Sequence, residues 1–127
     1  MKKTGLAALA LFFGFIATAQ QEISISELDK HIGDSVKVCT KIYGGIYLDR
    51  SKGSPTLLNA GGAYPNAPLT ILIWDDVRKK FSLGASGKEA PEVFFKDKEI
   101  CVTGKVILYK EKPEIVIYDE KQLVIKE

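Results

Sequence analysis

Aromatic and cationic side chains recur together along this chain, and the combination suits single-stranded nucleic acid. Aromatic rings provide flat surfaces on which bases stack, and lysine and arginine side chains follow the phosphate backbone. The candidates are Tyr43, Tyr47, Arg50, Lys52, Tyr64, Trp74, Tyr109, Lys110 and Lys112. Each has a structural alternative, because tyrosine and tryptophan on a small β-protein often pack the ring at the rim of the core and leave the polar atom in water. These residues form one surface only if the fold brings them together.

The sequence offers little for catalysis or for metal binding. The single histidine, His31, has no evident nucleophile or orienting partner. Asp75 and Asp76 precede the basic run Arg78-Lys79-Lys80, which is the order that the electrostatics of a helix favours. We therefore interpret Asp75 as a helix cap and the basic run as a solvated helix face. We expect a binding protein rather than an enzyme, with no cofactor and no metal.

The first 19 residues have the pattern of a secretory signal peptide. Lys2 and Lys3 precede an apolar run, and Ala17-Thr18-Ala19 forms an A-x-A cleavage site. The apolar run is too short to span a bilayer comfortably, and an uncleaved N-terminal anchor is the alternative interpretation. We expect cleavage after Ala19 and a periplasmic or secreted mature chain, residues 20–127, without stable membrane insertion.

The mature chain has no formal net charge, so attraction to nucleic acid would have to come from local patches of basic residues. The whole chain has 18 Lys plus Arg against 16 Asp plus Glu, a formal net charge of +2. Lys2 and Lys3 leave with the signal peptide, which holds no acidic residue, so cations and acids then balance. The remaining length suits a single domain with one core.

Runs of β-branched and aromatic residues predict five strands. The first three cover residues 36–48, 56–60 and 69–74, and two more lie within residues 99–119, joined at Lys110-Glu111-Lys112-Pro113. Three short helical stretches are also predicted. One precedes the first strand, with Ser26 as cap, Asp29 completing a capping box and Gly33 as stop. The others are a helix over residues 75–83 and a brief turn of helix or loop over residues 91–95.

This order of elements predicts a five-stranded OB-fold, a Greek-key barrel whose helix falls between the third and fourth strands. A small barrel must coil its strands, and glycines form the corners. Such corners explain why glycines stand inside two of the predicted strands. They are Gly104, in the middle of an otherwise apolar strand, and the pair Gly44-Gly45.

Alternation along the last two strands predicts which side chains face the core. Those expected to face inward are Ile100, Val102, Val106, Leu108, Ile115 and Ile117. Those expected to face outward are Glu99, Cys101, Thr103, Lys105, Glu114, Val116 and Tyr118. Cys39, on the first strand, also has outward parity. Because the first and fourth strands of an OB-fold pair, Cys39 and Cys101 form either a disulfide between neighbouring strands or two free buried thiols.

Three segments together resemble the small extracytoplasmic OB-fold domains of bacteria, in the broad OB group of nucleic-acid-binding domains. They read HIGDSVKVCTKI, TLLNAGGAYPNAPLTILIW and KEICVTGKVILYKEKPEIVIYDEKQLVI, and they span most of the mature chain. The most specific pattern is V-x-G-K-V-x-x-Y-x-x-x-P-E-I-V-I, over residues 102–117, and L-N-x-G-x-x-Y-P-N over residues 58–66 is similar to the segment between strands two and three. The resemblance implies the OB-fold and a nucleic-acid ligand, and it supplies no catalytic motif.

Two hypotheses for function follow. The first is an exported OB module that binds single-stranded DNA or RNA weakly, with Tyr43, Tyr47, Arg50 and Lys52 on one concave face and affinity that falls steeply with salt. The second is an envelope module that binds a protein, a small ligand or an oligosaccharide. It predicts little dependence on salt and a face dominated by Trp74, Tyr64 and the loop over residues 59–68.

Overall fold

The computed structural model describes residues 20–127, so the predicted signal peptide lies outside the described residues. The strands are β1 (Gln21–Ile23), β2 (Ser35–Tyr47), β3 (Thr56–Ala60), β4 (Leu69–Ile73), β5 (Glu99–Lys105), β6 (Ile107–Tyr109), β7 (Lys112–Ile117) and β8 (Leu123–Ile125). The helical segments are η1 (Ile25–Lys30), α2 (Asp75–Arg78), α3 (Pro91–Phe94) and η2 (Glu120–Gln122). In this part of the chain, no helix is long and apolar enough to cross a membrane.

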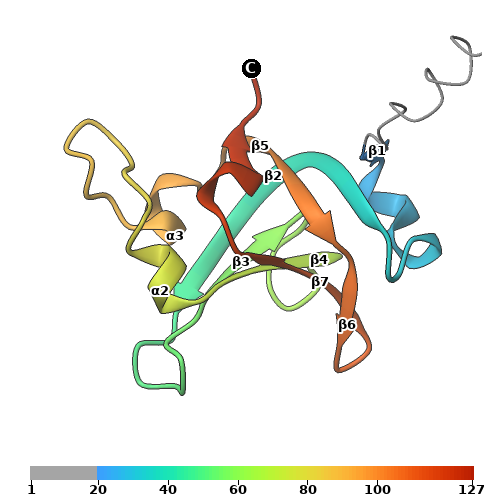
Figure 1. Cartoon of the computed structure of the whole chain (residues 1–127), viewed down its shortest axis with the longest axis horizontal. Helices are drawn as coiled ribbons and strands as arrows, with labels where there is room; N and C mark the ends of the chain where they lie inside the picture. Colours follow the sequence, from blue (N-terminus) through green and yellow to red (C-terminus); the bar gives the residue numbers. More distant parts are fainter. Residues whose placement is uncertain (1–19) are drawn as a thin grey trace, which may run out of the picture.

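The strands form one curled sheet in the order β6-β7-β4-β3-β2-β5-β8, with β1 beside β2 (Figure 1). β1 pairs parallel with β2, β4 pairs parallel with β7, and the other pairs are antiparallel. The long strand β2 bends over the centre of the molecule and pairs with β3 at one end and β5 at the other. β6 follows β5 after one residue, yet the two strands stand near opposite ends of the strand order. The sheet therefore curls so that its two ends come close together. The fold is OB-like.

The expected closed barrel of five strands is wrong in two respects. The sheet has eight strands, and it is open. The predicted fourth strand is divided at Val106 into β5 and β6, and the two pair with different neighbours. β8 occupies the edge of β5 that β2 leaves free, and β1 adds a further short strand. The helices between β4 and β5 lie where the OB order predicts them.

The core fills the inside of the curl. Its side chains come mainly from alternate positions of β2, β3, β4, β5 and β7, as the period of two predicts. Ile100, Val102 and Val106 are fully buried as expected, whereas Leu108 is 52% exposed. Leu108 keeps its inward parity, because it pairs with Pro113 on the side of β7 that carries Ile115, but it is exposed because the β6–β7 hairpin projects beyond the core (Figure 1). Phe95, next to α3, is also buried in the core.

Gly104 stands where β5 passes close to β7. Its φ of +154° is rarely adopted by other residues, and a Cβ at this position would lie 2.7 Å from Ile115 Cγ2. The close approach explains the glycine that the sequence places within this strand. The other predicted corner also coincides with an irregularity, because the β2–β3 register shifts between Ile42 and Gly44.

The predicted start of the first helix and the predicted end of the second both require correction. The first helix is a 3-10 segment capped by Ser24, not Ser26, since the Glu27 carboxylate reaches back to accept a hydrogen bond from the Ser24 N–H at 3.0 Å. The second helix, α2, ends at Arg78 rather than near Leu83. Phe81 and Leu83 still pack against the core from the segment that follows. A short irregular chain can therefore bury the same apolar face that the sequence assigns to a helix.

Cys39 and Cys101 form a disulfide, which confirms the first of the two alternatives. The two residues are direct partners in the antiparallel β2–β5 pair. Their neighbours Val38 and Val102 point into the core. The cross-link therefore lies on the outer side of this part of the sheet.

Candidate functional site

A groove of about 650 Å³ lies over β3, β4 and β7, on the side of these strands that faces away from the core. Its floor includes Leu57 of β3, Thr70 and Leu72 of β4, and Glu114 of β7. These positions alternate with core residues such as Ile71 and Ile115. The run Leu69–Ile73 is apolar on both faces because one face meets the core and the other forms the groove floor.

The groove gathers six of the nine predicted ligand-binding residues: Lys52, Tyr64, Trp74, Tyr109, Lys110 and Lys112. They come from the loop after β2, the loop after β3, the end of β4 and the β6–β7 hairpin. In Figure 1 the loop over residues 48–55 and the β6–β7 hairpin project from the same side of the molecule. Tyr64 and Tyr109 are 81% and 58% exposed, so most of each side chain is accessible to a ligand.

Tyr43, Tyr47 and Arg50 lie outside this groove. Tyr43 is exposed on β2, with Lys41 Nζ 5.0 Å from the centre of its ring. Arg50 is exposed in the turn that follows β2. The nucleic-acid hypothesis places Tyr43, Tyr47, Arg50 and Lys52 on one concave face. The structure does not bring these four residues together, and only Lys52 lines the groove.

Tyr47 belongs to a polar cluster that joins α2 to its surroundings. Its hydroxyl donates to Asp75 Oδ1 at 2.9 Å, and the Arg78 guanidinium stacks 3.6 Å from the centre of its ring. Arg78 also donates to Thr56 Oγ1 at 2.6 Å and pairs with Glu92 at 2.7 Å. Hydrogen bonding lowers the pKa of Asp75 and raises that of Tyr47.

The cluster corrects two expectations about α2, one at each end of the helix. Trp74 is the N-cap residue, so Asp75 is not the cap but the first residue of the helix, paired with Lys79 at 3.2 Å. The Arg78 side chain is only 16% exposed, so it is not part of a solvated face. Lys79 and Lys80 are exposed, as expected.

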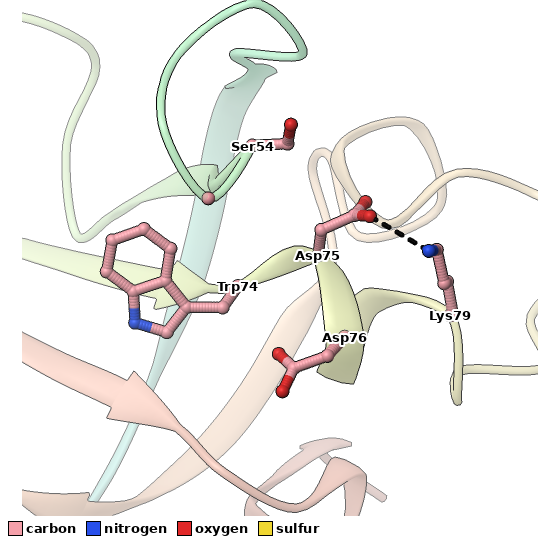
Figure 2. A pocket seen from close by; sticks show the side chains of 6 residues that line it. Ser54, Trp74, Asp75, Asp76 and Lys79 are labelled. Carbon is pink, nitrogen blue, oxygen red and sulfur yellow. Dashed lines mark ion pairs between the residues drawn. The ribbon is translucent and has the colours of Figure 1, made fainter.

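At the groove wall, the Trp74 indole packs closely against the backbone of Gly53. A Cβ on Gly53 would lie 2.7 Å from the indole Cζ3, so only a glycine lets the loop after β2 approach the ring this closely. Gly53 also has a φ of +78°, which favours glycine. Figure 2 shows the indole turned away from the Asp75–Lys79 ion pair. The side chain is 38% exposed and also lines the groove.

Two contacts organise the hairpin wall of the groove. Lys110 and Glu111 at the turn both have positive φ, 51° and 67°, as a two-residue turn of the type common in β-hairpins requires. Lys110 Nζ lies 5.4 Å from the centre of the Tyr109 ring. Lys112 Nζ donates to the Pro65 carbonyl at 3.3 Å and so joins the hairpin to the loop that carries Tyr64.

Glu114 is a feature of the groove that reasoning from the sequence missed. Its outward parity is correct, but the residue is only 7% exposed because the groove walls cover it. Burial raises the pKa of its carboxyl group. An acidic residue between apolar neighbours, in the pattern P-E-I-V-I, was the available signal.

His31 pairs with Asp34, with 3.1 Å between Nδ1 and Oδ2, and it lies outside the groove. Within residues 20–127, no group of three or more His, Cys, Asp or Glu side chains is placed to hold a metal ion.

Comparison with known proteins gives a distant structural likeness. No protein-family model matches the sequence, and no curated protein matches it. Among solved structures, the chain is similar to a protein described as a putative aspartyl-tRNA synthetase from Leishmania major Friedlin, with a TM-score of 0.48 and 10% sequence identity. The match covers 95% of this chain and 26% of that one, so the chain spans about a quarter of that protein's length.

Proposed function

We propose that the protein is an exported OB-like module that binds single-stranded nucleic acid weakly in the groove over β3, β4 and β7, without catalysis. The observation that carries this proposal is the meeting of three aromatic and three lysine side chains in one groove, from segments far apart in the sequence. Strand faces flanked by loops are where OB-folds hold oligonucleotides.

The chemistry of the groove supports the proposal. Tyr64, Trp74 and Tyr109 supply rings on which bases stack, and stacking tolerates any base sequence. Lys52, Lys110 and Lys112 are exposed, where their ammonium groups can meet phosphates without first breaking an ion pair. Because residues 20–127 carry no formal net charge, attraction to a polyanion arises locally, and modest affinity is expected.

The first test is a fluorescence-anisotropy titration of the disulfide-bonded protein against short labelled single-stranded DNA and RNA. We expect saturable binding that weakens as the salt rises from about 50 mM to about 200 mM, because lysine–phosphate contacts release counterions. The same measurement on Trp74→Ala is expected to show about a tenfold loss of affinity, because a stacking surface has been removed. Tyr43→Ala is the matched control, because Tyr43 is an exposed aromatic residue outside the groove.

The lysines are tested as a set. Replacing Lys52, Lys110 and Lys112 with alanine is expected to weaken binding and to reduce the slope of log affinity against log salt by about one for each phosphate that is no longer neutralised. Replacing Lys80, Lys96 and Lys126, which are exposed elsewhere, changes the net charge equally and serves as the control. If both triple variants weaken binding to the same extent, the groove is not the binding site.

Absence of binding even at low salt would overturn the proposal. The alternative occupants would then be a glycan or an envelope protein, for which Trp74 and Tyr64 supply the exposed aromatic surface. Either would bind with little dependence on salt, and a glycan array and pull-down from an envelope fraction would distinguish them.

An oxidising compartment is the second part of the proposal. The disulfide between Cys39 and Cys101 supports it, because such bonds persist in exported proteins. Mass spectrometry of protein recovered from an exporting cell is expected to show an N-terminus at Gln20. Recovery of the intact N-terminus from the cytoplasm would contradict this.

A further inference from the structure

Glu114 is an acidic side chain on the floor of an otherwise apolar and cationic groove. It lies on β7 between two register partners, Thr70 on β4 and Ile107 on β6. Only 7% of the residue is exposed, and what is exposed faces the groove. A carboxylate at such a position loses most of its contact with water.

Among the described residues, nothing satisfies this carboxylate. Burial is the only cause that acts on its pKa, so neither a hydrogen bond nor a nearby charge offsets the cost. Lys112 donates to the Pro65 carbonyl instead. Residues 20–127 contain no completely buried side-chain oxygen that lacks a hydrogen-bond partner, so the Glu114 oxygens keep access to the groove. The carboxylate therefore faces the groove, where its oxygens can contact a bound ligand.

A group bound to the ionised form of this carboxylate must donate hydrogen bonds. An ionised carboxylate only accepts them, and its charge repels phosphate. Single-stranded bases are read by hydrogen bonds to their Watson–Crick edges. Guanine presents two adjacent donors on that edge, N1–H and the N2 amine, which match the two oxygens of a carboxylate. Adenine and cytosine place an acceptor beside their amine, and uracil and thymine place their single N–H between two carbonyls.

We propose that Glu114 selects guanine, by accepting hydrogen bonds from N1–H and the N2 amine of a base that enters the groove. The lysines hold the phosphates at the rim, and the aromatic rings hold the flanking bases. This inference rests on the proposed function and adds a base preference to it.

The test compares single-stranded thymine-rich DNA oligonucleotides, and uracil-rich RNA equivalents, that differ at one position. That position carries guanine, inosine, adenine, cytosine or the background base. We expect guanine to bind about tenfold more tightly than the background base, as a bidentate base contact typically does. Inosine, which lacks the N2 amine but keeps N1–H, should fall between the two.

Glu114→Gln separates the inference from the proposed function. The amide has one accepting oxygen and one donating amine, so it cannot accept two hydrogen bonds side by side, and the ratio of guanine affinity to background affinity should fall to about one. Guanine preference that persists in this variant would overturn the inference. Wild-type binding with no base preference would overturn it too, and would leave the proposed function standing. No binding of any oligonucleotide would overturn both.

A second measurement needs no variant. In the wild-type protein the carbon-13 signal of the Glu114 carboxyl group, followed as a function of pH, should show a lower pKa when the guanine oligonucleotide is bound, because donated hydrogen bonds favour the ionised form. The background oligonucleotide should not lower that pKa, because it adds negative charge and excludes water without donating a pair of hydrogen bonds. Equal effects of the two oligonucleotides would contradict direct contact with guanine.

Discussion

At the scale of single residues, the hydrogen bond from the Tyr47 hydroxyl is the largest of several contacts that favour the ionised form of Asp75. The 2.9 Å hydrogen bond from Tyr47 lowers the pKa of this carboxyl group. A carboxyl pKa that is lower in the folded than in the unfolded state stabilises the fold above the unfolded value, and the contribution disappears as the pH falls through the folded value.

Tyr47→Phe should therefore raise the pKa of Asp75 and reduce the free energy of unfolding at neutral pH. The difference between wild type and variant should become smaller in acid, where Asp75 is protonated in both. Urea denaturation at a series of pH values measures this, and Tyr43→Phe, which changes an exposed tyrosine on the same strand, is the control. A difference that stays constant from neutral to acidic pH would show that Asp75 is not involved.

Glu114 shows what a residue pattern can and cannot predict about a site. The period of two correctly assigned it to the side of β7 away from the core. It could not show that loops from three other parts of the chain cover that side. Six of the nine predicted binding residues do meet in the groove. Tyr47 does not, because its ring packs against Arg78 and its hydroxyl donates to Asp75.

At the scale of elements, the crossing of β5 and β7 depends on the missing side chain of Gly104. Gly104→Ala should reduce the free energy of unfolding by roughly 1–3 kcal/mol, because the new methyl group would press on Ile115 and force one strand to move. Chemical denaturation measures this change. Gly33→Ala is a useful comparison, because Gly33 also has positive φ but a Cβ there would meet no atom within 4 Å. Equal destabilisation of the two variants would mean that backbone strain alone, rather than the close approach to β7, accounts for the effect.

The elements themselves differ in how far the sequence predicts them. The strands β2, β3 and β4 lie within a residue of their predicted positions, because long β-branched runs bounded by turn residues are a strong signal. The break at Val106 was missed. The run from β5 into β6 is largely apolar, and Gly104 marks a bend close to the break but does not show that pairing passes from one neighbour to another there. Helix α2 was predicted too long, because apolar residues spaced like a helix face can also anchor an irregular loop.

At the scale of the whole molecule, one covalent bond joins two cysteines that are 62 residues apart in sequence. Reducing it should lower the free energy of unfolding by about 2–4 kcal/mol, because the unfolded chain regains the freedom that the closed loop removes. Urea denaturation with and without reductant measures this. The double variant Cys39→Ala with Cys101→Ala is the control, since reductant should leave its stability unchanged.

Trp74 is the one tryptophan in the sequence, and it stands on the groove wall against Gly53. The protein therefore carries a single indole fluorophore, which can be excited apart from the tyrosines, at the proposed ligand position. Its emission should respond when a base stacks on the indole, and again, differently, when unfolding releases the ring into water. Occupancy and stability can then be followed in one unlabelled sample, from the same side chain.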